Sequence, residues 1–510
     1  MRPRRAAVAL ALAAVLVPDA ALVPGAAAQT ASLRTRLDAI FDRPATSNAF
    51  WGVSIADAAT GEVLYRRNAD RSLVPASNMK LYTTAAALDL FGADHRFTTR
   101  LYTDGRVDGA TLRGNLVVRG GGDPTLGGAY FADQDKTDRL APFRAFADSL
   151  RSRGITRVEG DVVGDDDVFD DLTLGYGWAW DDLNYYYSTE ISGLNAYDNC
   201  VDVTIAGTTP GQPGRVTWEP LQTSYVSFVN RTLTRGAGTG VRERYERPLG
   251  SNAYVLASRV GSDTRDTECL AVSNATRFAA SLVRDVLAAE GIVVTGEPRD
   301  ADEQPAALDY SRMARVATWT SVPMGRIAEA VNKESINLYA DALLKAVGTL
   351  PGAPTATDDA PLGSHERGAR LAMRRVWGPM GVDTAHVSIV DGSGLSRMDL
   401  VTANSTVALL RAMNRHRDSA VRRAFYESLP IGGVDGTLKN RYRDAAGANA
   451  RNNVRAKTGS LGGVSSLSGY VTTRGGRRLA FSLMCNHYTV GTSAIRSAQD
   501  AAVNVLAGLP

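Results

Sequence analysis

The chain has 510 residues, 44% of them apolar, and its 57 basic and 54 acidic side chains give a net charge of +3. This length exceeds what one hydrophobic core normally organises, so we expect two or more domains. The near balance of charge gives no reason to expect nucleic acid as a partner.

The first 28 residues have the parts of a secretory signal: a basic start, an apolar run from Ala6 to Val17, and small residues at positions 26–28. The apolar run is too short to span a bilayer comfortably, so residues 1–28 are predicted to be a cleaved signal peptide. We therefore expect an exported protein, periplasmic or otherwise extracytoplasmic. No other apolar run is long enough to form a transmembrane anchor.

A predicted hairpin and helix come next. Residues 50–67 alternate between apolar and polar side chains around an Ala-Thr-Gly turn, which is typical of a β-hairpin. A helix is predicted from about residue 77 to 91, with Ser77 and Lys80 on one face. A serine becomes a good nucleophile when an adjacent base takes its proton, and a desolvated neutral lysine can be that base. Serine is also a common helix cap, so this pair alone decides nothing.

Residues 98–290 are rich in Gly, Thr, Val and Asp in short alternating runs, which predicts a mainly β region. Cys200 and Cys269 lie there, and in an oxidising compartment they either form a disulfide or stay free. Cys485, in an apolar run, is interpreted as a thiol in the core. Residues 178–200 gather aromatic side chains beside Asp181 and Asp182, and packing of a small β domain is the simpler role for the aromatic side chains.

Two further polar motifs follow in the second half of the chain. Residues 325–346 form a helical pattern that contains Ser335-Ile336-Asn337, and residues 455–471 are predicted strands that carry Lys457-Thr458-Gly459. A second hairpin over residues 466–485 and a helix from about 491 to 507 complete the chain. Only six of the 57 basic residues are lysines. Because a guanidinium cannot release its proton near neutral pH, a lysine kept among arginines is a candidate for chemistry.

The three motifs, in this order, resemble the active-serine set of penicillin-binding proteins and serine β-lactamases. The strings DGSGLSR at 391–397, GVDGTL at 433–438 and RAKTGSLGGVSSLSGYV at 455–471 are similar, more narrowly, to the D-alanyl-D-alanine carboxypeptidase/endopeptidase family, the low-molecular-mass class C penicillin-binding proteins of peptidase family S13. This resemblance implies an α+β fold with a β-lactamase/DD-peptidase-like catalytic domain, an antiparallel sheet flanked by helices, from residues 29–97 and 316–510. It also implies a large mainly-β insertion, residues 98–315, made of two small domains.

The resemblance also implies a mechanism. Ser77 would attack the carbonyl of the penultimate D-alanine of a peptidoglycan stem peptide, Lys80 would accept its proton, and Ser335 would relay a proton to the leaving amine. Asn337 would hold the substrate amide and the Lys80 amine. Positive charge from Lys457, together with Thr458, Gly459 and Ser460, would bind the terminal D-alanine and its carboxylate. The backbone amides of Ser77 and Ser460 would form the oxyanion hole.

The resemblance also implies residues that recognise the rest of the stem peptide. In the family an acidic residue of the insertion contacts the side-chain amine of diaminopimelate, which is Asp181 or Asp182 here. Arg397 would meet the diaminopimelate carboxylate, or else belongs to a structural turn. β-Lactam antibiotics are the expected inhibitors. No cofactor and no metal is expected, because five histidines and three cysteines show no ligand spacing. Oligomeric state is not predicted, nor is a preference for trimming stem peptides over cutting crosslinks.

Two alternatives stay open on the sequence. A class A β-lactamase needs a deacylating glutamate in an E-x-x-L-N loop, and the nearest match, Glu190 to Asn195, is one residue too long and precedes Ser335; a class C enzyme has tyrosine where this chain has Ser335. The second alternative is a non-catalytic scaffold that binds the cell wall with the same fold. A site that had lost its activity could replace Lys80 or Lys457 by arginine without consequence. Both lysines are present in this arginine-rich chain, which argues against the scaffold.

Overall fold

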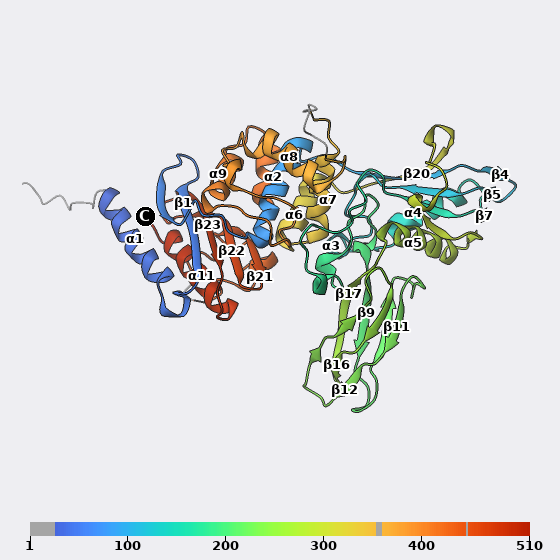
Figure 1. Ribbon diagram of the computed structural model, residues 1–510, viewed down its shortest axis with the longest axis horizontal. Coiled ribbons are helices and arrows are strands. Elements are labelled where there is room, and N and C mark those ends of the chain that lie inside the picture. The colour runs from blue at the N-terminus through green and yellow to red at the C-terminus, as the bar shows by residue number, and fades with distance from the viewer. Residues whose placement is uncertain (1–25, 353–359, 445–446) are drawn as a thin grey trace, which may run out of the picture.

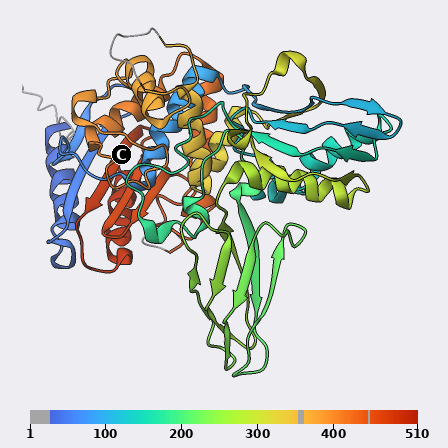
Figure 2. The same cartoon turned by 45° about the vertical axis from the view of Figure 1, so that its right-hand side comes forward.

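A computed structural model describes residues 26–352, 360–444 and 447–510. The molecule is elongated: one lobe holds the C-terminus and helix α1, a second lies at the opposite end, and a third projects sideways between them (Figures 1 and 2). Residues 1–25 of the predicted signal peptide lie outside the described residues, and its last three positions open helix α1 (Ala26–Phe41). Within the described ranges no helix is long and apolar enough to cross a membrane.

The first lobe is built on a five-stranded antiparallel sheet in the order β2-β1-β23-β22-β21. Both predicted hairpins are confirmed, and β1 pairs with β23, so segments from both halves of the chain share one sheet. The strands are β1 (Phe50–Asp57), β2 (Val63–Arg67), β21 (Arg455–Leu461), β22 (Val464–Thr472) and β23 (Arg478–Asn486).

Strand alternation divides this sheet between two cores. In β23, Phe481, Leu483 and Cys485 pack with α1 and α11 (Thr492–Ala507), whereas Ala480 and Met484 pack with the helices of the other face. Cys485 is a buried free cysteine, as predicted. A sheet covered by helices on both faces confirms the α+β fold class.

The helices of the second core surround the Ser77 region. They are α2 (Met79–Phe91), α6 (Met324–Lys333), α7 (Asn337–Gly348), α8 (His365–Ala372), α9 (Ala403–Asn414) and α10 (Ser419–Ser428). The prediction of a continuous helical pattern over 325–346 is wrong at one point: the helix stops after Lys333, and a new one starts at Asn337. Ser335, with φ +64°, is in the left-handed region, which no α-helix can accommodate.

The second lobe belongs to the insertion and joins two sheets, β18-β7-β5-β4 and β19-β8-β6-β3-β20. Its helices α4 and α5 bury Phe146 and Phe278 in one hydrophobic cluster with strand residues such as Val118. The strands are β3 (Thr98–Thr103), β4 (Arg106–Asp108), β5 (Thr111–Arg113), β6 (Leu116–Arg119), β7 (Arg157–Glu159), β8 (Val162–Asp165), β18 (Val293–Val294), β19 (Pro298–Asp300) and β20 (Ala314–Thr320). The helices are α4 (Ala141–Arg151) and α5 (Ala275–Ala289). Helix α3 (Ala129–Asp135), also in the insertion, packs on the first lobe instead, because its Phe131 shares the core of the Ser77 region and stacks on Tyr339 of α7.

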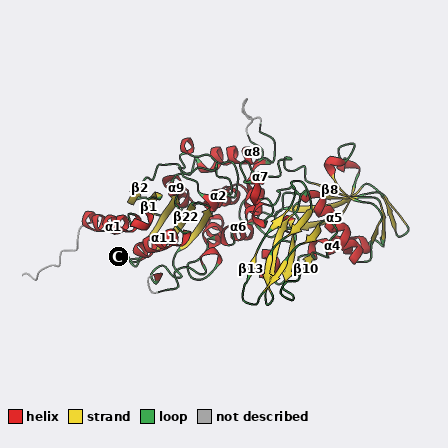
Figure 3. Cartoon of the chain, turned by 60° about the horizontal axis from the view of Figure 1, so that its bottom comes forward, coloured by secondary structure: helices red, strands yellow, loops and turns green. Residues whose placement is uncertain are grey.

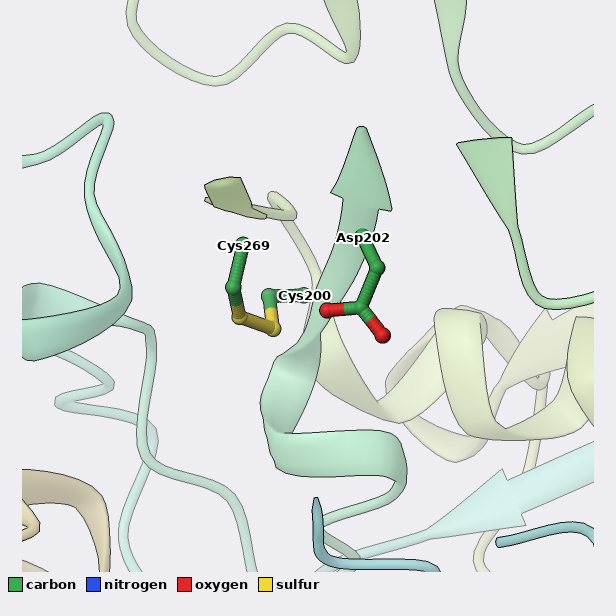
Figure 4. Close-up of side chains that lie close together, drawn as sticks. All are labelled: Cys200, Asp202 and Cys269. Carbon is green, nitrogen blue, oxygen red and sulfur yellow. A yellow bond between two sulfur atoms is a disulfide. The ribbon is translucent and has the colours of Figure 1, made fainter. Parts of the chain in front are cut away.

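The third lobe, residues 200–271, is made of strands and loops (Figure 3). One three-stranded sheet, β10-β9-β17, holds β9 (Cys200–Ala206), β10 (Arg215–Glu219) and β17 (Arg265–Ala271). The others contain β11 (Ser227–Asn230), β12 (Leu233–Arg235), β13 (Val241–Arg242), β14 (Tyr245–Glu246), β15 (Ala253–Leu256) and β16 (Arg259–Gly261). Cys200 and Cys269 form a disulfide between β9 and β17, which settles the alternative left open by the sequence (Figure 4). The boundaries of the predicted domains stay a prediction.

Candidate active site

The Ser77 turn brings the first motif together. A 3-10 turn, Ala76–Asn78, runs directly into α2, and Ala76 has φ +48°. Such a conformation costs a non-glycine residue free energy and is found where function fixes the backbone. Lys80, one turn along, donates from Nζ to Ser77 Oγ over 3.0 Å. The predicted serine–lysine contact is therefore present.

Lys80 is fully buried, and three oxygen atoms surround its amine. Besides Ser77 Oγ, these are Asn337 Oδ1 at 2.5 Å and the Ser393 carbonyl at 2.8 Å. Burial lowers the pKa of Lys80 to about 8, and nearby carboxylates, Asp341 and Asp391 foremost, oppose that shift. An amine with this pKa is partly neutral near pH 7, which a base for Ser77 has to be.

A second serine–lysine pair faces the first. Lys457, on the edge strand β21, donates from Nζ to Ser335 Oγ over 2.8 Å and to the Thr458 carbonyl over 2.9 Å. The break between α6 and α7 makes this contact possible, because Ser335 stands outside both helices. Burial lowers the pKa of Lys457 well below its usual value, the positive charge of Lys80 lowers it further, and Glu334 opposes both.

A cavity of about 550 Å³ opens over the two pairs. Ser77, Ser335 and the predicted substrate residues Thr458, Gly459 and Ser460 all line it, together with Thr437, Asn440, Arg441, Ser465, Ser466 and Arg496. Thr437 lies in the GVDGTL string, where the sequence analysis assigned no role, and its hydroxyl is 2.8 Å from that of Thr458. A Cβ on Gly459 would lie 2.2 Å from Ser466 Oγ and 3.0 Å from the Ser77 nitrogen, so only glycine lets the edge strand approach the nucleophile this closely.

The loop 391–397 holds the third acceptor for Lys80, and the sequence analysis did not foresee how. Asp391, fully buried, accepts hydrogen bonds from the backbone amides of Ser393, Gly394 and Ser396 at 2.6–3.1 Å. Asp341 of α7 accepts from the amides of Gly392 and Ser393 at 2.7 and 3.1 Å. These two carboxylates fix the peptide that presents the Ser393 carbonyl to Lys80.

A third buried carboxylate, that of Asp399, belongs to the same hydrogen-bond network. Its Oδ1 accepts from the amides of Val390 and Asp391, and its side chain is fully buried beside that of Asp391. Burial and the neighbouring Asp391 charge raise the pKa of Asp399 well above its usual value. Burial also acts to raise the pKa of Asp391, but hydrogen bonds from the Asp399 side chain, Trp178 and the amides of Ser396 and Gly394 outweigh it and lower that pKa. We infer that Asp391 is ionised and Asp399 protonated, because two adjacent buried carboxylates do not both ionise.

The insertion reaches this site through residues 178–187. Trp178 Nε1 donates to Asp391 Oδ2 over 2.9 Å, and Asn337 Nδ2 donates to the Tyr187 carbonyl over 2.6 Å. Both contacts connect the aromatic segment to groups that position Lys80. The sequence analysis assigned packing to these aromatic side chains, because nothing in the local pattern distinguishes an indole that packs from one that also donates.

The three remaining candidate residues are placed as follows. Asp182 accepts a hydrogen bond from the Tyr187 hydroxyl at 3.0 Å, and Asp181, its neighbour in the turn, is exposed. Arg397 is exposed and donates to the Gly462 carbonyl, in the turn after β21, over 3.0 Å. None of the three contacts Ser77, Lys80, Ser335 or Lys457 in the part of the chain that the structure describes.

Two other groups bear on the alternatives. Glu190, of the string nearest to a class A deacylating loop, accepts from Ser273 Oγ and from the amide of Asn274, so it fastens one segment of the insertion to another. The potential metal ligands that cluster among the described residues are Cys200, Asp202 and Cys269 (Figure 4). The two sulfur atoms of that cluster are joined in the disulfide, which removes them as thiolate ligands.

Two serine–lysine pairs, an asparagine and the edge strand of an antiparallel sheet define the active-serine class that contains penicillin-binding proteins and serine β-lactamases. Residues 33–509 match the D-Ala-D-Ala carboxypeptidase 3 (S13) family. The chain belongs to this family, which confirms the resemblance found in the sequence.

Individual relatives agree with this assignment. The chain is 33% identical over 481 residues to a D-alanyl-D-alanine carboxypeptidase of Actinomadura sp. (strain R39), covering 92% of this chain and 84% of that protein. It is 27% identical over 438 residues to D-alanyl-D-alanine carboxypeptidase DacB of Haemophilus influenzae, covering 84% of each. The crystal structure of penicillin binding protein 4 (dacB) from Haemophilus influenzae superposes with a TM-score of 0.75 at 24% identity, over 91% of this chain and 97% of that one, which shows the same fold.

Proposed function

We propose that this protein is a penicillin-binding serine D-Ala-D-Ala peptidase that cleaves peptidoglycan stem peptides through an acyl-enzyme on Ser77. The observation that carries the proposal is the buried Lys80 amine, 3.0 Å from Ser77 Oγ and with a pKa lowered to about 8. Family membership, shared with proteins named as D-alanyl-D-alanine carboxypeptidases, supplies the substrate class.

In the acylation step, neutral Lys80 takes the Ser77 proton over their existing contact while Oγ attacks the carbonyl carbon of the penultimate D-alanine. The oxyanion that forms lies against the backbone amides of Ser77 and Ser460, and each such donor is typically worth about 3 kcal/mol of barrier. The C–N bond then breaks, terminal D-alanine leaves as an amine, and the acyl group stays on Ser77 as an ester. Water hydrolyses the ester in the second step.

The leaving nitrogen needs a proton, and the second pair supplies a route. Ser335 Oγ lines the cavity and already accepts a hydrogen bond from Lys457, so it can donate its own proton towards the substrate. Asn337 Oδ1 accepts a hydrogen bond from the Lys80 amine, and this contact helps to orient the amine towards Ser77 Oγ. Thr458 and Ser460 hydroxyls at the cavity wall, with the Lys457 amine behind them, bind the terminal carboxylate.

Recognition of the rest of the stem peptide is assigned to two exposed side chains that do not line the cavity themselves. The exposed carboxylate of Asp181 is free to meet the side-chain amine of diaminopimelate, whereas Asp182 already accepts from Tyr187, so the pairing favours Asp181. Arg397, exposed at the end of loop 391–397, is the residue we assign to the diaminopimelate carboxylate; besides its bond to the Gly462 carbonyl it has further guanidinium donors to offer. Peptides that present either a free D-alanine or a crosslinking residue offer Ser77 the same carbonyl, so both trimming and cutting of crosslinks fit this site.

The site of action follows from the substrate. Peptidoglycan lies outside the cytoplasmic membrane, and the basic, apolar and small-residue order of residues 1–28 is that of a cleaved secretory signal. We therefore place the mature protein in the periplasm or an equivalent extracytoplasmic space.

The test is the intact mass of the purified protein at intervals after addition of benzylpenicillin, together with the drug that remains. We expect an adduct of one drug mass on the wild type, none on Ser77→Ala, and little drug consumed. Rapid loss of the drug without an adduct would instead assign a β-lactamase. No adduct and no loss of drug would refute acyl-enzyme chemistry and favour the scaffold.

A further inference from the structure

The third lobe carries a sheet face that is rich in arginine. Six short strands form one long three-stranded ribbon. Strands β15 and β16, consecutive in the chain, make its centre; β11 and β12 pair with them on one side, and β14 and β13 on the other. In its central strand Tyr254, Leu256 and Val260 are buried, while Val255, Ala257 and Arg259 alternate with them on the outer side. The ribbon therefore has one buried side and one side that faces outward.

Strand register places five arginines on that outer side. Arg242 is paired directly with Arg259, which is also paired with Leu233. The same registers, extended by one step, set Arg231 and Arg244 on either side of Ala257; the Ala257 amide donates to the Arg244 carbonyl. Arg235 is paired with Gly261. We call Arg231, Arg235, Arg242, Arg244 and Arg259 the arginine face.

The arginine face is poor in compensating charge. Arg244 pairs with Glu246 on the same side. For the other four arginines no ion pair is present within the ranges that the structure describes, and all four are exposed. Glu243 alternates to the opposite side of the ribbon from Arg242. There it lies near Asp266 and Glu268; the pKa of Glu268 is raised to about 7, first by burial and then by the charges of Glu243 and Asp266.

This arrangement does not serve the fold. Like charges directly opposite each other in a sheet destabilise it. Arg242 and Arg259 form such a pair, next to further arginines, on a lobe that projects from the rest of the molecule (Figures 1 and 2). Their cost to the fold is compensated if an anion binds there.

We propose that the arginine face binds a polymer that carries phosphate groups along its chain. Guanidinium groups match phosphate oxygens in a two-pronged geometry that lysine lacks. The arginines span three strands, about 10 Å from Arg231 to Arg244 at a strand spacing near 5 Å, so they fit several phosphates in a row rather than one. The outward positions of these strands hold no aromatic side chain of the kind that anchors a protein in a membrane interface. The proposal is independent of the Ser77 chemistry.

The test uses the full-length protein and long-chain inorganic polyphosphate as the probe. Four unpaired arginines predict a salt dependence with a log–log slope near −3, which weakens binding roughly 50-fold between 50 and 200 mM salt. Arg242→Gln with Arg259→Gln should halve this slope and lower affinity at least about tenfold at the lower salt. The double variant should unfold no more easily than the wild type, since it removes a like-charge pair.

Arg106→Gln with Arg157→Gln is the matched control, because it removes the same charge from exposed strands of the second lobe. We expect it to bind polyphosphate like the wild type, and all variants to be acylated by benzylpenicillin at the wild-type rate. Absence of polyphosphate binding by the wild type, or equal losses in both double variants, would overturn the proposal. Equal affinity for polyglutamate would refute the choice of phosphate, and tighter binding to phosphatidylglycerol vesicles would replace the polymer by a lipid surface.

Discussion

Lys80→Arg should lower the rate of acylation by a β-lactam about 10³-fold, because a guanidinium keeps the positive charge but cannot accept the Ser77 proton. A positioned general base typically contributes about 10²–10⁴-fold, and burial is what makes Lys80 available as one. With a pKa of about 8, roughly one Lys80 in ten is neutral at pH 7. For a lysine at its usual pKa near 10.5 the fraction is roughly one in 3,000, so burial raises the supply of free base about 300-fold.

The pH dependence gives a sharper test of the same reasoning. Acylation by a chromogenic cephalosporin, followed by stopped flow, should rise about tenfold per pH unit and level off above about pH 8, where Lys80 is neutral. Lys136→Arg, at the exposed C-terminal end of α3, keeps the charge and leaves both serine–lysine pairs intact, so it should reproduce the wild-type profile. A flat profile below pH 8, or less than a tenfold loss in Lys80→Arg, would refute Lys80 as the base.

The lowered pKa of Lys80 also affects stability. Between about pH 8 and the usual lysine value the unfolded chain holds the Lys80 proton and the folded chain does not, so the free energy of unfolding rises with pH in that window. The full shift corresponds to about 3 kcal/mol. Urea denaturation of the wild type and of Lys80→Met at several pH values isolates this contribution, because the variant should lack it. Parallel pH profiles of the two proteins would contradict the assignment.

Three further changes test the rest of the site. Gly459→Ala should reduce acylation at least about 100-fold, since its Cβ would lie 2.2 Å from Ser466 Oγ and push β21 away from Ser77; kinetics with penicillin check this. Asp391→Asn should cost roughly 2–3 kcal/mol in urea denaturation, because buried amides lose an ionised acceptor. Replacing Cys200 and Cys269 by serine opens a loop of 69 residues, which should destabilise the insertion by about 4 kcal/mol while the acylation rate at 25 °C stays unchanged.

The sequence predicted the elements whose signals are local. Alternation around a turn identified both hairpins of the central sheet, and the Ser77 helix and the last helix lie within two residues of their expected starts. The break at Ser335 was missed, because a left-handed residue between two helical patterns leaves no mark when it is not glycine. The side chain of Ser335 contacts Lys457, which lies 122 residues further along the chain, so the partner that belongs to this break is not visible in the local pattern.

The buried carboxylates show what sequence reasoning lacks even where the motifs are clear. Asp341 lies four residues after Asn337 and Asp399 eight after Asp391, and each local pattern fits a surface residue as well as a core one. Only the packing of α7 against loop 391–397 reveals that Asp341, together with Asp391, holds the peptide whose carbonyl binds Lys80. Asp399 supports the same loop through the amides of Val390 and Asp391. Trp178 donates to the same Asp391, so the insertion takes part in positioning the base. A substrate contact with residues 178–187 is therefore connected to the Lys80 amine through two hydrogen-bonded steps, Asp391 and the Ser393 peptide.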